Sequence, residues 1–387
     1  MTHRPHRKGQ KLRTLLTLLG TAVLLSACGP TETRIGCILP LSGHAERYGE
    51  MARKGVELAA EEINAAGGLR GKPLVMLYRD SKGSPSAGLR AATNLIDEEG
   101  VNAILGDLLS EITLELAPFC EKRQVVLFSP ASSAPKITKA GVYVFRNYPS
   151  DVLEGAYLAQ FASEKLRLLD LVVISVANAY GQGLKESFLK YYTGPNREVH
   201  KVISFPQGDP DLREIRSVVE SVRPDGIYVI AYDPDRRAIF EALRATGVEA
   251  RILATRDSRD LIREAGELAE DVIFPLDDYD SSNSDPNVQE FVRKYSERYG
   301  GELPGLWAAQ AYDALHMLAR GIDGAKGTYG QDVQIQLSTM KEYLGATGVT
   351  NLDTNGDVTR YPKIYVFSGG DFLTYEAYEA AQVPPEG

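Results

Sequence analysis

Short apolar runs alternate with amphipathic segments along most of the chain. Residues 34–41 form an apolar run that predicts a buried strand, and residues 51–66 carry apolar side chains at helical spacing up to Gly67. The alternation continues with predicted strands at 74–78, 102–106 and 125–129 and predicted helices at 87–99 and 110–123. Strands that alternate with helices in this way predict a parallel sheet with helices on both faces.

The same alternation starts again after residues 147–151. Predicted helices lie at 152–166 and 184–192, and two more end at residues 222 and 246. Predicted strands lie at 171–176, 199–205, 226–232, 251–254 and 271–274. An acidic, turn-rich segment at 277–286 indicates a crossover before two further helices, and residues 363–367 predict one last strand. The pattern therefore predicts an α/β protein with two doubly wound parallel-sheet units and several chain crossings between them.

The first residues have the features of a targeting segment. Five basic residues and no acidic ones precede an apolar run at 15–25, which is shorter than the about 20 residues that span a bilayer. Leu-Ser-Ala-Cys at 25–28 resembles the bacterial lipobox, in which the cysteine becomes the lipidated first residue. We therefore expect a signal peptide at 1–27, lipid on Cys28 and a tether at 28–33; an ordinary signal peptide with an incidental cysteine is the alternative. Either places the protein in the periplasm or on the outer face of the cytoplasmic membrane, with the lipid as its only membrane contact.

Net charge argues against one class of partner, and the cysteine content bears on disulfide formation. Without the five basic residues of the leader, 38 of the 43 basic residues remain against 52 acidic ones, a net charge of −14. Nucleic-acid binding needs clustered Lys and Arg, so such a partner is not expected. Cys37 and Cys120 both lie in apolar contexts; export permits a disulfide, and two buried free thiols are slightly favoured.

Motifs for metals, cofactors and catalysis are incomplete. Asp353-x-Asn355-x-Asp357 lacks the glycine and the distal glutamate of a calcium loop, so Asn355-Gly356 is better interpreted as a tight hairpin turn. Gly181-x-Gly183 lacks the third glycine of a dinucleotide fingerprint, and the histidines have no metal-ligand spacing. No cofactor and no metal are therefore expected.

Several motifs, in order, resemble the type I periplasmic binding proteins of the leucine/isoleucine/valine-binding kind. They are Ile35-Gly-Cys-Ile-Leu-Pro-Leu-Ser-Gly43, Tyr48-Gly49, Gly55-Val-Glu-Leu-Ala-Ala-Glu-Glu-Ile-Asn-Ala-Ala-Gly-Gly68, Ser129-Pro-Ala-Ser-Ser-Ala-Pro135, Tyr143-Val-Phe-Arg-Asn147, Asn178-Ala-Tyr-Gly181 and Asp353-Thr-Asn-Gly-Asp357. The resemblance implies two lobes joined by three hinge crossings, a ligand between them, an ABC permease as partner, and a monomer. It places residues 34–148 with 277–352 in the first lobe and residues 149–276 with 353–387 in the second.

The resemblance also implies where a ligand binds. The family's serine for the α-carboxylate matches Ser110, which opens a predicted helix where free amides favour an anion; a helix cap is the plainer interpretation. The stretch Ala131, Ser132 and Ser133 matches the family segment that binds both the ammonium and the carboxylate, and a polar turn before Pro135 is the alternative.

Aromatic and acidic residues complete the expected site. Tyr48 and Tyr180 match aromatic residues that pack the ligand in the family, with core packing as the alternative. The ammonium needs an acid on the second lobe, for which Asp257 fits best, although a surface salt bridge with its arginine neighbours is a rival; Asp233 and Tyr232 are further candidates.

One acid departs from the family pattern. Asp107 stands where the family often has proline or a small residue, beside the expected carboxylate site. It indicates either a ligand with more positive charge or a side chain that points into solvent.

These features predict an amino-acid-binding protein that closes on its ligand and delivers it to an importer. A sensor subunit for amides or small organic acids has the same fold and is the alternative. A hydrolase would need a nucleophile beside a base, and neither Ser110 nor Ser133 has a histidine near it in sequence. We therefore do not expect an enzyme. The side-chain specificity stays open.

Overall fold

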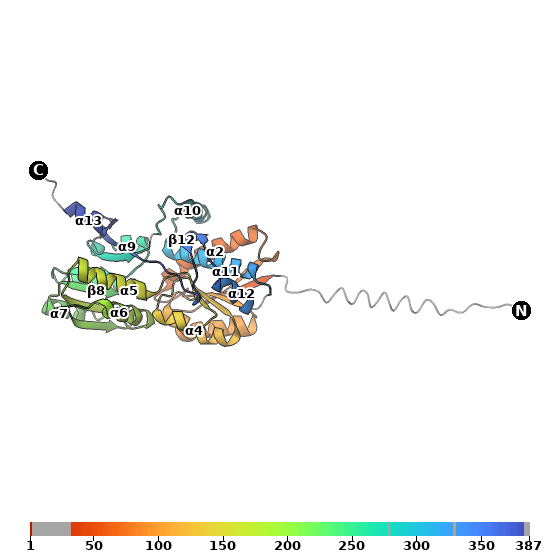
Figure 1. Ribbon diagram of the computed structural model, residues 1–387, viewed down its shortest axis with the longest axis horizontal. Helices are drawn as coiled ribbons and strands as arrows, with labels where there is room; N and C mark the ends of the chain where they lie inside the picture. The colour runs from red at the N-terminus through yellow and green to blue at the C-terminus, as the bar shows by residue number, and fades with distance from the viewer. Residues whose placement is uncertain (2–31, 278, 328–329, 383–387) are drawn as a thin grey trace.

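The computed structural model describes residues 1, 32–277, 279–327 and 330–382. The predicted lipidation site Cys28, the signal segment and most of the tether lie outside these residues. Figure 1 shows two bodies side by side, one with α2, α4, α11 and α12 and the other with α5, α6, α7 and β8. No helix in the described part of the chain has the length and apolar character needed to cross a membrane.

The first lobe is built on a five-stranded sheet in which all neighbouring strands are parallel. In the order β2-β1-β3-β4-β5, these are β2 (Leu74–Asp80), β1 (Thr33–Leu39), β3 (Ala103–Gly106), β4 (Val126–Ser129) and β5 (Val144–Arg146). Its helices are α2 (Glu46–Ala65), α3 (Pro85–Thr93), α4 (Ser110–Arg123), α10 (Pro286–Arg298), α11 (Leu306–Gly324) and α12 (Gly330–Ser338). The order reverses between β1 and β3, so a crevice opens at the carboxyl ends of these strands.

The second lobe has a seven-stranded sheet with the same doubly wound centre. In the order β14-β13-β10-β9-β8-β6-β7, these are β14 (Asp371–Thr374), β13 (Lys363–Ser368), β10 (Ile273–Leu276), β9 (Arg251–Ala254), β8 (Gly226–Ile230), β6 (Asp170–Val176) and β7 (Glu198–Phe205). The helices are α5 (Asp151–Gln160), α6 (Ala179–Tyr191), α7 (Leu212–Val222), α8 (Asp235–Arg244), α9 (Arg259–Ala265) and α13 (Tyr375–Gln382). All neighbouring strands of this sheet are parallel except the two pairs that include β13, which runs antiparallel to β10 and to β14.

Short helical turns and a hairpin complete the described elements. They are η1 (Asn94–Glu98), η2 (Pro135–Lys139), η3 (Phe161–Lys165), η4 (Gly266–Ala269), β11 (Tyr343–Gly345) and β12 (Gly348–Thr350). The chain passes between the lobes after β5, after β10 and after β12, and each lobe encloses its own apolar core. The α/β architecture with two doubly wound sheets is therefore confirmed, whereas the exact lobe boundaries stay a prediction.

The end of the chain differs from the sequence prediction. Residues 363–367 were expected to form the last strand, but β13 turns at Gly369-Gly370 into β14 and then α13. Both glycines have positive φ, which allows the tight return of the chain. Apart from the turn at Asn355-Gly356, the short, irregular segments between α12 and β13 carried too little periodicity for a prediction.

Two close approaches fix the first lobe. Helices α2 and α11 pack so tightly that a Cβ on Gly55 would lie 2.0 Å from the carbonyl oxygen of Ala308.

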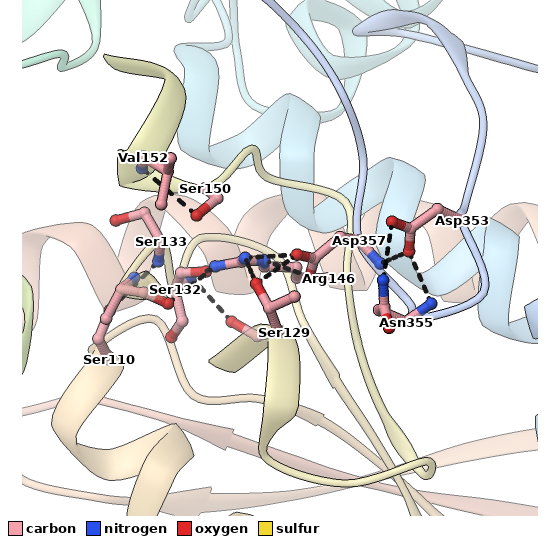
Figure 2. Close-up of polar contacts among 12 residues, drawn as sticks. Ser110, Ser129, Ser132, Ser133, Arg146, Ser150, Val152, Asp353, Asn355 and Asp357 are labelled. Carbon is pink, nitrogen blue, oxygen red and sulfur yellow. Dashed lines mark hydrogen bonds and ion pairs between the residues drawn. The ribbon is translucent and has the colours of Figure 1, made fainter. Parts of the chain in front are cut away.

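The third crossing is held by Arg146, which is fully buried and donates from Nε and Nη2 to the two carboxylate oxygens of Asp357, each at 2.7 Å. Figure 2 shows this pair beside the turn at Asp353 and Asn355, where Leu352 and Val358 pair as in a hairpin. A turn thus lies at the predicted place, but the Gly356 amide donates to the Asp353 carbonyl oxygen at 3.1 Å, so Thr354 and Asn355 are its central residues.

Candidate functional site

A cavity lies between the two lobes, at the carboxyl ends of strands from both sheets. Its volume is about 40 Å³, which is room for a few waters. Its walls are formed by Tyr48, Leu108, Leu109, Ser110, Ala131, Ser133, Tyr148, Asp151, Glu154, Tyr180, Ala231, Tyr232, Arg256, Asp257 and Trp307. Seven of the nine residues predicted to bind ligand are among them.

The first-lobe end of the cavity presents hydroxyl and amide groups. Ser110 is the first residue of α4, and its Oγ accepts hydrogen bonds from the backbone amides of Ser133 (3.2 Å) and Ala134 (3.1 Å). Because Oγ already accepts twice, its own hydrogen remains for an acceptor on a ligand. The amides at a helix start add positive potential. This end can therefore bind a carboxylate.

Two predicted residues do not line the cavity. Asp233 is one of them, and its Oδ2 accepts from Arg236 Nη2 at 3.0 Å. Ser132 is the other. Its hydroxyl bonds the carbonyl oxygens of Asp107 (3.2 Å) and Leu108 (3.1 Å) and the hydroxyl of Thr113 (2.8 Å). Figure 2 shows Ser132 between Ser110 and Arg146, within the polar contacts that hold this loop. Ser132 thus supports the loop that carries the neighbouring hydroxyl, and sequence alone could not show which of three adjacent residues face inward.

Five aromatic side chains form a continuous wall drawn from both lobes. Tyr180 stacks on Tyr232 with ring centroids 4.8 Å apart, and Tyr232 meets Tyr48 at 6.1 Å. Trp307 continues the wall, with its ring 6.0 Å from Tyr48 and 5.3 Å from Tyr148. Aromatic edges and faces at these distances form a rigid apolar surface. The cavity therefore offers an apolar aromatic surface in addition to its polar groups.

Asp257 faces the cavity but is already occupied. Its Oδ1 accepts from the amide of Ser258 (2.7 Å) and the indole Nε1 of Trp307 (3.0 Å), and its Oδ2 accepts from Arg236 Nη1 (2.7 Å) and the Tyr48 hydroxyl (3.0 Å). Two of these donors, Tyr48 and Trp307, belong to the first lobe. Asp257 thus joins the lobes, and its ion pair is buried, not at the surface as the rival interpretation had it.

A second group of charges at the cavity was not predicted. Arg256 is buried and donates from Nε to Glu154 (3.0 Å) and from Nη1 to Asp277 (3.1 Å), while its Nη2 has no partner among the described residues. Burial raises the pKa of Glu154, and the Arg256 charge opposes that shift. The carboxyl of Asp151 lies in the same group, and one of its oxygens, Oδ2, also has no partner there.

Burial also dominates the ionisation of two acids near the site. It raises the pKa of Asp151 to about 8, with the Glu154 charge as the next cause. It raises the pKa of Asp107 to about 7. Asp107 is fully buried and accepts from the amide of Leu109 at 2.9 Å, so the expectation that it points into solvent is wrong.

The residues that sequence reasoning missed follow element ends. Tyr148 lies in the junction between β5 and α5, Asp151 is the first residue of α5, and Trp307 is the second residue of α11. Tyr148 and Asp151 lie in the segment 147–151, after which the sequence alternation starts again, and Trp307 is the chain's one tryptophan. These signals could have pointed to the three residues. Outside the site, Cys37 and Cys120 are both buried and unpaired.

Comparison with known proteins gives a consistent match. A family model described as periplasmic binding protein matches residues 32–368. The leucine-, isoleucine-, valine-, threonine- and alanine-binding protein of Pseudomonas aeruginosa is 23% identical, with 97% of this chain and 98% of that protein covered. The structure resembles the leucine binding protein LivK of Thermotoga maritima (TM-score 0.81, 29% identity, 88% and 97% covered). It also resembles LivJ of Streptococcus pneumoniae in complex with isoleucine (TM-score 0.79, 26% identity, 89% and 98% covered).

Proposed function

Since this chain belongs to the periplasmic binding protein family, we propose that it captures an amino acid with an apolar side chain between its lobes and delivers it to an ABC importer. The observation that carries this proposal is the mixed lining of the cavity, which combines hydroxyl and amide groups with aromatic side chains. An α-amino acid likewise combines a polar head group with a side chain that can be apolar. Two relatives of this fold and family are named for or hold branched aliphatic amino acids.

In the proposed complex, the first lobe holds the carboxylate. Ser110 donates its hydroxyl, and Ser133 and Ala131 contribute polar groups of the neighbouring loop. The aliphatic side chain packs on Tyr180 and Tyr232 from the second lobe. A zwitterion enclosed by both lobes has its charges paired by the protein, because buried charges without partners are costly.

The two lobes then close on the bound ligand. Tyr48 reaches from the first lobe to Asp257 and to the amide of Asp233 in the second (3.1 Å). Ligand that binds the closed form better than the open one shifts the population toward it. The importer recognises the closed shape, and the protein acts by binding, without chemical turnover.

We further propose the predicted N-terminal arrangement: a signal peptide at 1–27, lipid on Cys28 and a tether at 28–33, on a monomer with the lobe boundaries given above. Membrane fractionation and mass spectrometry of the purified protein test this. Wild type should carry lipid on its first residue, and Cys28→Ala should leave the membrane fraction. A wild-type protein that is cleaved elsewhere and carries no lipid would rule out the anchor.

Isothermal titration of residues 31–387 with amino acids tests the function. Leucine, isoleucine or valine should bind and should raise the thermal midpoint, since ligand at a hundred times its dissociation constant stabilises by about 2.7 kcal/mol. Ser110→Ala should weaken binding, and Thr93→Ala, on the far end of α3, is a hydroxyl deletion away from the cavity for comparison. Binding of amides or carboxylates without an ammonium, and of no amino acid, would replace this proposal by the organic-acid or sensor alternative.

A further inference from the structure

Resting on the proposed function, we propose that Asp151, and not Asp257, is the acid that receives the ammonium group of the ligand. Three acids line the cavity: Asp151, Glu154 and Asp257. They differ in how many of their oxygens are already used. That difference decides which of them can accept a new hydrogen bond.

Two of the three acids are committed to the protein. Both oxygens of Glu154 accept from Arg256, Oε1 from its amide (3.1 Å) and Oε2 from Nε (3.0 Å). Asp257 accepts four hydrogen bonds, two on each oxygen. A carboxylate has about four lone-pair sites, so Asp257 has none to spare. Glu154 keeps two of its sites, but each of its oxygens already has a partner on Arg256.

Asp151 is the acid with a free acceptor. It is 1% exposed and lines the cavity, yet its Oδ2 has no hydrogen-bond partner among the described residues. A buried polar atom without a partner is unusual and indicates a missing ligand or water. An ammonium group supplies three donors and the opposite charge.

The backbone places Asp151 beside the proposed head-group site. Its amide donates to the carbonyl oxygen of Ser133 at 2.9 Å, and it is the first residue of α5, capped by Ser150. Figure 2 shows Ser133 between Ser110 and the Ser150–Val152 turn. Ser133 thus contacts both residues: its amide donates to the Ser110 hydroxyl (3.2 Å), and its carbonyl oxygen accepts from the Asp151 amide. An amino acid has its two charged groups on one carbon, which suits such a spacing.

Binding of an ammonium group at Asp151 then releases a proton from the Asp151 carboxyl. The groups that act on its carboxyl are Glu154 on the same helix, Arg256 after β9, Arg146 on β5 and Ser133. The Asp151 charge in turn acts on three tyrosines, Tyr180 on α6, Tyr228 on β8 and Tyr232 after β8. Without ligand its pKa is raised to about 8, mainly by burial, so the acid is largely protonated at neutral pH. An ammonium group stabilises the charged form and lowers that pKa. Binding therefore releases up to one proton, and affinity rises with pH until about pH 8.

Calorimetry of leucine binding near pH 7, in two buffers with different ionisation enthalpies, measures this release. Wild type should release a proton, whereas Asp151→Asn should release none and should bind leucine about 100-fold more weakly or worse. 4-Methylpentanoate, which is leucine without the ammonium, should bind Asp151→Asn at least as well as wild type. Asp257→Asn is the matched control: it should lose affinity through weaker closure but keep the proton release.

The outcomes separate the two proposals. Leucine binding by Asp151→Asn within threefold of wild type, or an unchanged proton release, would overturn the assignment while leaving the proposed function intact. If folded wild type binds 4-methylpentanoate but no amino acid, the proposed function fails and the assignment with it. Circular dichroism establishes that each variant is folded before it is titrated.

Discussion

The bond between Tyr48 and Asp257 predicts how strongly closure depends on one hydroxyl group. Tyr48→Phe removes the donor to the Asp257 carboxylate (3.0 Å) and the acceptor for the Asp233 amide (3.1 Å), and leaves the ring in place. A hydrogen bond to a charged group contributes about 1.5–3 kcal/mol, and a neutral one about 1 kcal/mol. The closed form should therefore lose about 2 kcal/mol or more. Because only the closed form holds ligand, apparent affinity should fall about 30-fold.

A neighbouring residue provides the comparison. Arg47 also joins the lobes, through a bidentate pair with Glu264, but both side chains are about half exposed. Exposed pairs contribute about 0.2–1 kcal/mol, so Arg47→Gln should lower affinity by about fivefold at most. The variants at Tyr48 and Arg47 thus compare a buried contact between the lobes with an exposed one, both made by adjacent residues.

Calorimetry and small-angle X-ray scattering together measure the effect. Tyr48→Phe should bind more weakly and should show a larger radius of gyration than wild type at subsaturating ligand. A loss of ligand contact alone would weaken binding without changing the scattering of the ligand-free protein or of the saturated complex. If Tyr48→Phe binds within twofold of wild type and scatters identically, the bond to Asp257 does not control closure.

Further predictions concern stability and reactivity, each measured on residues 31–387. Gly55→Ala should destabilise by about 1–3 kcal/mol or more in thermal melts, because its Cβ would overlap an α11 carbonyl at 2.0 Å; an unchanged melting curve would mean that the helices separate freely. Arg146→Leu should cost about 3–5 kcal/mol by leaving Asp357 buried and unpaired, and adding Asp357→Leu should recover part of it; no recovery would contradict the ion-pair explanation. The raised pKa of Asp151, about 8 against 3.8, makes its contribution to stability full below about pH 4 and lost as pH rises through 8. Melting temperatures of Asp151→Asn should therefore exceed those of wild type increasingly toward about pH 9, and parallel curves would refute this. Burial raises the pKa of Cys120 to about 12, so a thiol reagent at neutral pH should react only after unfolding; rapid labelling of folded protein would contradict that burial.

Periodic segments were predictable because local burial decides them. The helix expected at 110–123 has the observed bounds, and the strand expected at 251–254 does as well. In both, a run of buried positions begins and ends within a few residues, so the sequence pattern contains the information. The start of α6 at Ala179 was missed by five residues, because Asn178 caps the helix before its apolar periodicity begins.

The position of the candidate site was predictable from the sequence, but the hydrogen-bond and ion-pair partners of its charged side chains were not. Ser110 and Ser133 follow strand ends, and parallel strands bring their carboxyl ends together. Whether Asp257 is free or occupied depends on Arg236 and Trp307, which lie 21 and 50 residues away in the chain. Such pairings come from the packing of two lobes, and no local pattern contains them.

The path of the chain has a consequence for how the protein is made. Helix α11 (Leu306–Gly324) packs on α2 in the first core, and β13 (Lys363–Ser368) fills a place in the second sheet between β10 and β14. Neither core can be completed until the ribosome has made most of the polypeptide. A message cut short after α12 would yield two unfinished halves instead of one finished domain. The polypeptide therefore has no finished domain until its synthesis is nearly over.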